Sequence, residues 1–156
     1  MPQGFTLSFA ERLDSLSEIK VVEGKEGEVL KKGCVYVAQA GNHLNLLKKN
    51  GDTVIHYTQE AYREGVRPCA NYMYESLVDS IYDEVVAVVM TGMGADGTEG
   101  ITNLKMSGRK TFVITQDNDS CVVYGMPKAC VRAKLSDEEV NLTQIAQEII
   151  LRVGVK

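Results

Sequence analysis

The stretch Val85-Val-Ala-Val-Val-Met-Thr-Gly-Met-Gly-Ala-Asp-Gly97 joins an uninterrupted apolar run to a turn rich in glycine. Residues 85–90 do not alternate between apolar and polar, which indicates a strand buried on both faces, as in a parallel sheet. We therefore expect a central strand here. The glycines allow the backbone to turn sharply at the carboxyl end of that strand, which is the edge of the sheet where α/β folds place their sites.

Together with the strand at residues 85–90, the residues after this turn predict a strand-helix-strand unit. Residues 99–107 favour a helix that Gly108 ends, and residues 111–115 favour a second strand. Further helices are predicted to begin at Lys128 and to run over residues 137–152. The fold class is therefore α/β, and residues 1–156 are expected to form a single domain.

The first half of the chain predicts a helix, several short strands and a second helix. Apolar residues at helical spacing place Phe5, Phe9, Leu13 and Leu16 on one face of an amphipathic helix. The predicted strands cover residues 19–23, 33–38 and 52–57, with turns at Gly41 and Asn50-Gly51. After Pro68, residues 71–82 predict the second helix.

Composition narrows the classes of function. With a net charge of -4 and no long run of Lys or Arg, the chain is not expected to bind nucleic acid. The longest apolar run, residues 85–90, is too short to span a bilayer, so we expect a soluble, cytoplasmic protein without membrane insertion. Four scattered cysteines and two histidines do not favour a metal site, and the cysteines are expected to be small apolar fillers. No cofactor is predicted.

The glycine turn allows three interpretations. Gly92, Gly94 and Gly97 formally match G-x-G-x-x-G, and Asp117 has the spacing of the acidic residue in a dinucleotide-binding fingerprint. The carboxylate of Asp96 would repel a pyrophosphate in that turn, and too few residues follow to complete such a domain. The turn can instead present Asp96 at the sheet edge, where a carboxylate can orient a histidine, or Asp96 can cap the following helix.

Two long strings then point to a known family. Thr91-Gly-Met-Gly-Ala-Asp-Gly97, followed by Ser120-Cys-Val-Val-Tyr-Gly-Met-Pro127, closely resembles the catalytic domain of the chemotaxis protein-glutamate methylesterases called CheB. The opening Met1-Pro-Gln-Gly-Phe-Thr-Leu-Ser-Phe-Ala-Glu-Arg-Leu13 is similar to the helix after the family's second strand. Val35-Tyr-Val-Ala38, Gly41, His43 and Arg67-Pro68 follow in family order. The resemblance implies a Rossmann-like, doubly wound, mainly parallel sheet that lacks the family's first two strands.

The resemblance also implies a chemistry. In that family a serine nucleophile, a histidine base and an aspartate orienter hydrolyse glutamyl methyl esters on chemoreceptors, and some members deamidate receptor glutamines. Asp96 matches the aspartate, which favours the orienting role over the cap, while Gly92, Met93 and Gly94 would lie near the oxyanion. The family serine and histidine fall before Met1. Helix-surface or turn positions are expected instead for Ser8, Ser15, Ser17 and Ser120. The resemblance implies a histidine outside the triad at His43, and His56 is expected in an alternating strand.

Two hypotheses follow from this pattern. The first is a methylesterase domain truncated at an internal methionine and inactive alone, whose partners would be the cytoplasmic helices of methylated chemoreceptors. The presence of an upstream receiver domain is left open. The second is a non-enzymatic remnant that binds receptors or signalling partners. Loss of two inner strands would leave a sheet edge open, so the truncated chain is expected to self-associate.

Overall fold

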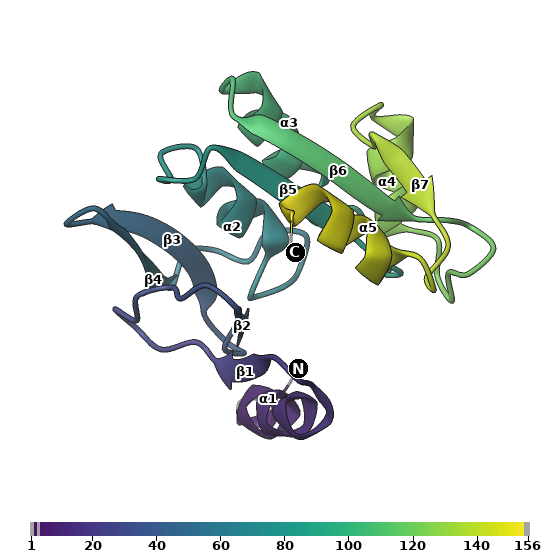
Figure 1. Cartoon of the computed structure of the whole chain (residues 1–156). Helices are drawn as coiled ribbons and strands as arrows, with labels where there is room; N and C mark the ends of the chain where they lie inside the picture. The colour runs from purple at the N-terminus through teal and green to yellow at the C-terminus, as the bar shows by residue number, and fades with distance from the viewer. Residues whose placement is uncertain (1, 3, 155–156) are drawn as a thin grey trace. The chain divides into compact units, whose positions relative to one another are not determined.

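The computed structural model describes residue 2 and residues 4–154. Contacts divide the chain into two compact units, of which the first ends at Ile81 and the second begins at Tyr82 (Figure 1). The single domain expected from the sequence stays a prediction. None of the helices in the described residues is long and apolar enough to cross a membrane.

The first unit combines two small sheets with two helices. Strand β1 pairs in parallel with β2, and β3 pairs antiparallel with β4. Helix α1 contacts β1 and β2, whereas α2 contacts β3. The bounds are α1 Phe5–Leu16, β1 Lys20–Glu23, β2 Cys34–Val37, β3 His43–Lys49, β4 Asp52–Thr58 and α2 Ala70–Ser76.

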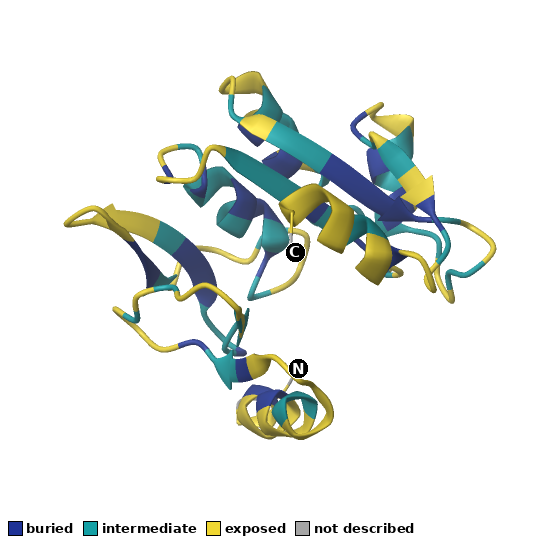
Figure 2. Ribbon diagram, viewed as in Figure 1, coloured by how far each residue is buried: buried dark blue, intermediate teal, exposed yellow. Residues whose placement is uncertain are grey.

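Helix α1 has the predicted bounds but buries a different face. The buried residues are Thr6 and Ala10, while Phe5 and Phe9 are exposed. Figure 2 shows α1 as mostly exposed, with a small buried part. The hydroxyl of Thr6 donates to Glu23 Oε1 at 2.5 Å and accepts from the amide of Ala40 at 3.2 Å. Small side chains let the helix approach the strands closely enough for these bonds. The face that packs against the strands is therefore the face of Thr6 and Ala10, not that of Phe5 and Phe9.

The hairpin of β3 and β4 was only half predicted. Asn50 and Gly51 both have positive φ, at 54° and 90°, as expected of the two central residues in a tight hairpin turn. Strand β3, which the sequence analysis did not predict, pairs with β4 along its whole length. The hydroxyl of Tyr57 in β4 donates to Gly24 O at 2.9 Å and accepts from the amide of Gln39 at 3.0 Å, which ties the hairpin to the ends of β1 and β2.

Helix α2 is shorter than predicted, because it ends at Ser76 rather than near residue 82. The amides of Leu77, Val78 and Ser80 each bond to a carbonyl three residues earlier, so the chain leaves the helix through tight turns.

The second unit is a parallel sheet in the order β5-β6-β7. Its bounds are β5 Glu84–Val89, α3 Thr98–Met106, β6 Lys110–Gln116, α4 Met126–Arg132, β7 Glu138–Val140 and α5 Ile145–Val153. The predicted strand-helix-strand unit is confirmed as β5-α3-β6, with Gly108 at a φ of 84° after the helix. Helix α4 begins two residues before the predicted Lys128.

Two expectations for this unit are wrong. Strand β5 is not central among the described residues, since it pairs only with β6. The helix predicted over residues 137–152 begins only at Ile145, and strand β7 takes its first part. The carboxylate of Asp137 accepts a hydrogen bond from the amide of Val113 at 2.8 Å, and the amide of Asp117 donates to Val140 O at 2.9 Å. These bonds to β6 and to the residue that follows it hold residues 137–140 extended.

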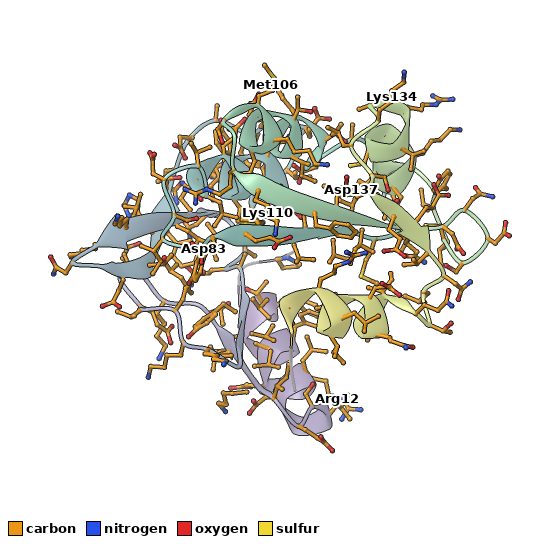
Figure 3. All side chains as sticks on the ribbon, turned by 45° about the horizontal axis from the view of Figure 1, so that its top comes forward. Arg12, Asp83, Met106, Lys110, Lys134 and Asp137 are labelled. Atoms are coloured by element: carbon orange, nitrogen blue, oxygen red, sulfur yellow. The ribbon has the colours of Figure 1, made fainter. Side chains whose placement is uncertain are left out.

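Successive side chains of each strand point to opposite faces of the sheet, and helices cover both faces. Ile114 lies on one face with Val140 and Ile145, and Val86, Val88, Phe112 and Ile149 pack against this cluster. Helix α5 therefore covers that face, and Figure 1 shows α3 and α4 on the opposite side of the same sheet. Met106, at the carboxyl end of α3, points away from the sheet (Figure 3).

Candidate functional site

The glycine turn of residues 91–97 lies between β5 and α3, at the carboxyl end of β5. Because β5 and β6 are parallel and paired up to Val89 and Thr115, the chain leaves both strands at the same edge of the sheet. The segment after β6, residues 117–125, leads to α4. The two strings that carry the family resemblance therefore begin side by side in space.

Reciprocal hydrogen bonds join the glycine turn to the segment after β6, which forms a second turn. The hydroxyl of Thr91 donates to Val123 O at 3.2 Å and accepts from the amide of Val123 at 2.9 Å. The amide of Gly92 also donates to Val123 O, at 3.0 Å. The carbonyl of Gly92 in turn accepts from the amides of Gly125, at 3.1 Å, and Met126, at 2.8 Å. Hydrogen bonds thus join residues 91–92 directly to residues 123–126.

The contact between the turns is too close for larger side chains. A Cβ on Gly125 would lie 2.5 Å from Gly92 O and 3.1 Å from Gly94 N, and a Cβ on Gly92 would meet the thioether of Met126. Gly125 has a φ of -102°, so only the lack of space requires glycine there. At Gly94 and Gly97 the reason differs, since their φ values of 88° and 92° are left-handed.

Asp96 is half-buried and precedes Gly97, which occupies the N-cap position of α3. The capping role and the orienting role weighed for Asp96 both stay predictions. Met93 and Gly94, earlier in the turn, are exposed. Across the described residues, no hydrogen bond engages the amide of either Met93 or Gly94, whereas the amide of Gly92 is already bound to Val123. Of the predicted oxyanion residues, Met93 and Gly94 therefore have the available donors.

Gln116, the last residue of β6, was not predicted as a site residue from the sequence. Its side chain is fully buried, and its Oε1 accepts from the amide of Thr91 at 2.8 Å. Its Nε2 donates to Ser120 O at 2.8 Å and lies 3.3 Å from Ser120 Oγ. The available signal was an amide side chain at the end of an apolar strand, directly before Asp117.

Ser120 lies in a packed turn, as expected, rather than at a nucleophile position. Its hydroxyl donates to Asp117 Oδ1 at 2.5 Å, and its amide donates to the same oxygen at 2.8 Å. The hydroxyl also accepts from the amide of Leu142 at 3.0 Å. The bonds from the Ser120 hydroxyl and amide, together with one from Asn141, lower the pKa of the Asp117 carboxyl from its ordinary value of 3.8.

The surroundings of both cysteines in this unit favour the neutral thiol. Burial raises the pKa of both the Cys121 and the Cys130 thiol, so each is held in its less reactive neutral form. Cys130 lies 3.4 Å from the hydroxyl of Thr98 inside the unit. In residues 2 and 4–154, no cluster of three or more His, Cys, Asp or Glu side chains has the arrangement of a metal site.

Both histidines belong to the first unit. His43 is buried, with Nε2 3.2 Å from Ala61 O and its ring centroid 4.5 Å from that of Tyr72. The Nδ1 atom of His56 lies 3.0 Å from Glu26 Oε1. Each ring therefore has a local structural partner.

Comparison with known sequences gives a consistent result. The profile of the CheB methylesterase family matches residues 1–149. A protein-glutamate methylesterase/protein-glutamine glutaminase from Halalkalibacterium halodurans is 44% identical over 152 residues, which cover 96% of this chain and 43% of that protein. Its namesake from Lawsonia intracellularis is 45% identical over 149 residues, covering 96% and 41%. The chain thus spans less than half the length of these curated relatives.

A solved structure matches the fold as well. The catalytic domain of the CheB methylesterase of Thermotoga maritima superimposes with a TM-score of 0.90 at 37% identity, covering 96% of this chain and 78% of that one. This match confirms the α/β, Rossmann-like fold class. With the profile match over nearly the whole length, it shows that the chain belongs to the CheB methylesterase family.

Proposed function

We propose that this chain is part of an enzyme that hydrolyses glutamyl methyl esters on the cytoplasmic helices of chemoreceptors. The observation that supports the proposal is the pair of hydrogen-bonded turns at one edge of a parallel sheet, since Met93, Gly94 and Asp96 directly follow the bonded residues 91–92. Relatives covering the chain are named protein-glutamate methylesterase/protein-glutamine glutaminase, which supports this substrate class.

In the proposed reaction a serine oxygen attacks the ester carbonyl and passes its proton to a histidine. Methanol leaves with that proton, and water then hydrolyses the acyl-serine to release the glutamate carboxylate. We propose that residues preceding Met1 in the intact protein supply the serine and the histidine, as the family resemblance implies.

Asp96 has the orienting role in this scheme. A carboxylate that accepts the second ring N–H of the histidine fixes the tautomer that can take the serine proton, and it stabilises the imidazolium that forms. The amides of Met93 and Gly94 are suited to receive the negative charge that develops on the ester oxygen. The positive φ of Gly94 gives the turn a shape that other residues adopt only with strain.

The test is the Asp96→Asn variant of the intact protein, assayed for release of methanol from methylated receptors. Asparagine keeps the size of the side chain but favours the wrong tautomer, so we expect kcat to fall by about 10³- to 10⁴-fold with an unchanged unfolding temperature. The matched control is Asp119→Asn, at an exposed carboxylate in the neighbouring turn, which should retain wild-type turnover. Near wild-type turnover in Asp96→Asn would overturn the assignment.

A further inference from the structure

The side chain of Gln116 satisfies groups in both turns at once. It is 0% exposed, its oxygen accepts from the backbone of Thr91, and its nitrogen donates to the backbone of Ser120. A buried amide side chain is costly unless its donors and acceptors are paired. Here the pairing partners are the first residue of the glycine turn and a residue of the turn after β6.

Ser120, which accepts the hydrogen bond from Gln116, is itself held by further hydrogen bonds. Ser120 is bonded to Asp117 by its amide and its hydroxyl, and its hydroxyl accepts from the amide of Leu142 after β7. Gln116 therefore connects the start of the glycine turn to a turn that is also bonded to the segment after β7. Its bonds add to those between Thr91 and Val123, which join the same two turns.

The glycine turn needs such an anchor because its own sequence does not fix its path. Residues 92, 94 and 97 are glycines, which have more backbone freedom than any other residue, and Met93 and Gly94 are exposed. Across the described residues, the amides of Met93 and Gly94 make no hydrogen bond that would hold them. Their position is set by where Thr91 and Gly92 are held at one end and where α3 begins at the other.

We propose that Gln116 is a positioning residue for ester hydrolysis, acting through Thr91 on the oxyanion donors of Met93 and Gly94 and on Asp96. The inference rests on the proposed function. Displacement of a catalytic group by about 1 Å can reduce turnover by about 100-fold. Gln116 is 0% exposed and so does not itself contact the substrate, and we expect its loss to act mainly on kcat through the position of the turn.

The kinetic test compares Gln116→Met with Thr115→Val in the intact protein. Methionine has a similar length but leaves Thr91 N and Ser120 O without their partners. Thr115, the preceding residue of β6, is also 0% exposed, but its hydroxyl bonds to Ser136 rather than to either turn. We expect kcat on methylated receptor to fall about 10- to 100-fold in Gln116→Met with KM changed less than about 2-fold, and both constants to stay near wild type in Thr115→Val.

Equal kinetics in the two variants, or a loss in Gln116→Met that appears only in KM, would overturn the proposal. If Gln116→Met does not fold, Ser120→Ala decides, because it removes one acceptor of Gln116 Nε2 and loosens the anchor. A kcat reduced by about 3- to 10-fold at constant KM would support the positioning role, and a wild-type kcat would contradict it.

Amide hydrogen exchange gives a readout that is independent of turnover. The amides of Thr91 and Gly92 should exchange at least about 10-fold faster in Gln116→Met than in Thr115→Val, because only the first variant releases the turn. Absence of esterase turnover in the wild type would overturn the proposed function alone. The exchange rates would then still decide whether Gln116 holds the turn, and equal rates in both variants would show that it does not.

Discussion

The carboxylate of Asp117 gives the turn after β6 a dependence on pH. Its pKa is lowered by hydrogen bonds from the hydroxyl and amide of Ser120, so the fold favours the charged form. The stabilisation is therefore complete above the ordinary value of 3.8 and is lost as the pH falls through the lowered pKa. We expect the Ser120 amide to exchange faster than in neutral solution, after correction for intrinsic rates, once the pH drops below that range.

The control for this effect is Asp117→Asn, which keeps an acceptor oxygen but cannot titrate. Its Ser120 amide should show corrected exchange rates that are independent of pH over the same interval. A local probe is needed because Asp14 and Glu26, in the first unit, also have lowered pKa values and contribute to global acid unfolding. Identical profiles for wild type and variant would assign the acid sensitivity to other groups.

Gly125 is the residue at which one added methyl group should disturb the site most directly. In Gly125→Ala the new Cβ would collide with the carbonyl of Gly92 and approach the amide of Gly94. We expect a loss of about 1–3 kcal/mol in the free energy of unfolding and a fall in kcat of at least about 10-fold. The measurements are chemical denaturation and steady-state turnover of the intact protein.

Gly108→Ala is the control that distinguishes a specific effect on the site from a general loss of stability. A Cβ there meets nothing within 4 Å, but the φ of 84° strains the backbone by about 1–2 kcal/mol. The variant should therefore lose stability while keeping wild-type kcat. Similar kinetic losses in both glycine variants would show that the close contact at Gly125 has no special role.

Among the elements, α1 gives a direct test of which face is packed. Thr6→Val keeps the shape of the side chain but removes the bonds to Glu23 and to the amide of Ala40. We expect it to cost about 1–3 kcal/mol in the free energy of unfolding. Ser8→Ala, at an exposed hydroxyl that bonds only within the helix, should cost less than about 0.5 kcal/mol.

Comparable losses of stability in Thr6→Val and Ser8→Ala would mean that the face of Thr6 and Ala10 is not the packed one. Sequence periodicity alone could not have identified this face. Phe5 and Phe9 form the stronger apolar signal, whereas a threonine and an alanine are buried because they allow close approach and specific bonds.

The sequence predicted elements well where the signal was local. The apolar run of β5, the glycines around α3 and the Gly108 stop specify β5-α3-β6 without help from distant residues. Strand β7 could not be predicted in this way, because Glu138–Val140 has one apolar residue and owes its extended form to bonds with β6. Strand β3 had a usable signal, since a turn at Asn50-Gly51 requires a partner strand before it.

In the candidate site too, only the residues with a local sequence signal could be predicted. The glycine turn and Asp96 were found because they lie in one continuous string that resembles a family. Gln116 was not, because its importance depends on bonds to Thr91 and Ser120 that only the fold brings within reach.

For the molecule as a whole, apolar surface remains uncovered in each unit. Leu16 is 67% exposed on α1, and Leu151 is 64% exposed on α5. Strand β5 has a paired neighbour on only one side among the described residues. Exposed apolar faces and open strand edges favour association with other chains.

We therefore expect a polypeptide of these 156 residues to self-associate, with a mass by light scattering that rises with concentration. Its free energy of unfolding should be lower than that of the intact protein measured alongside it. A compact monomer at every concentration, with stability equal to that of the intact protein, would contradict this expectation.

The same polypeptide is predicted to have no methylesterase turnover above the buffer rate. The serine and the histidine act as a unit, and Asp96 alone supplies neither the nucleophile nor the base. The assay is methanol release from methylated receptor membranes, with the intact protein as the positive control. Turnover by the 156-residue polypeptide would show that a nucleophile lies within it.

The bonds between residues 91–92 and 123–126 have a consequence for building chimeras between related domains. A donor's version of residues 91–97 alone would meet backbone partners shaped for a different turn, and Gly125 leaves no space to adjust. Transplanting residues 91–97 together with residues 116–127 carries the partners along. The smallest transferable piece of this edge is therefore a pair of segments that are separated in the chain by a whole helix and strand.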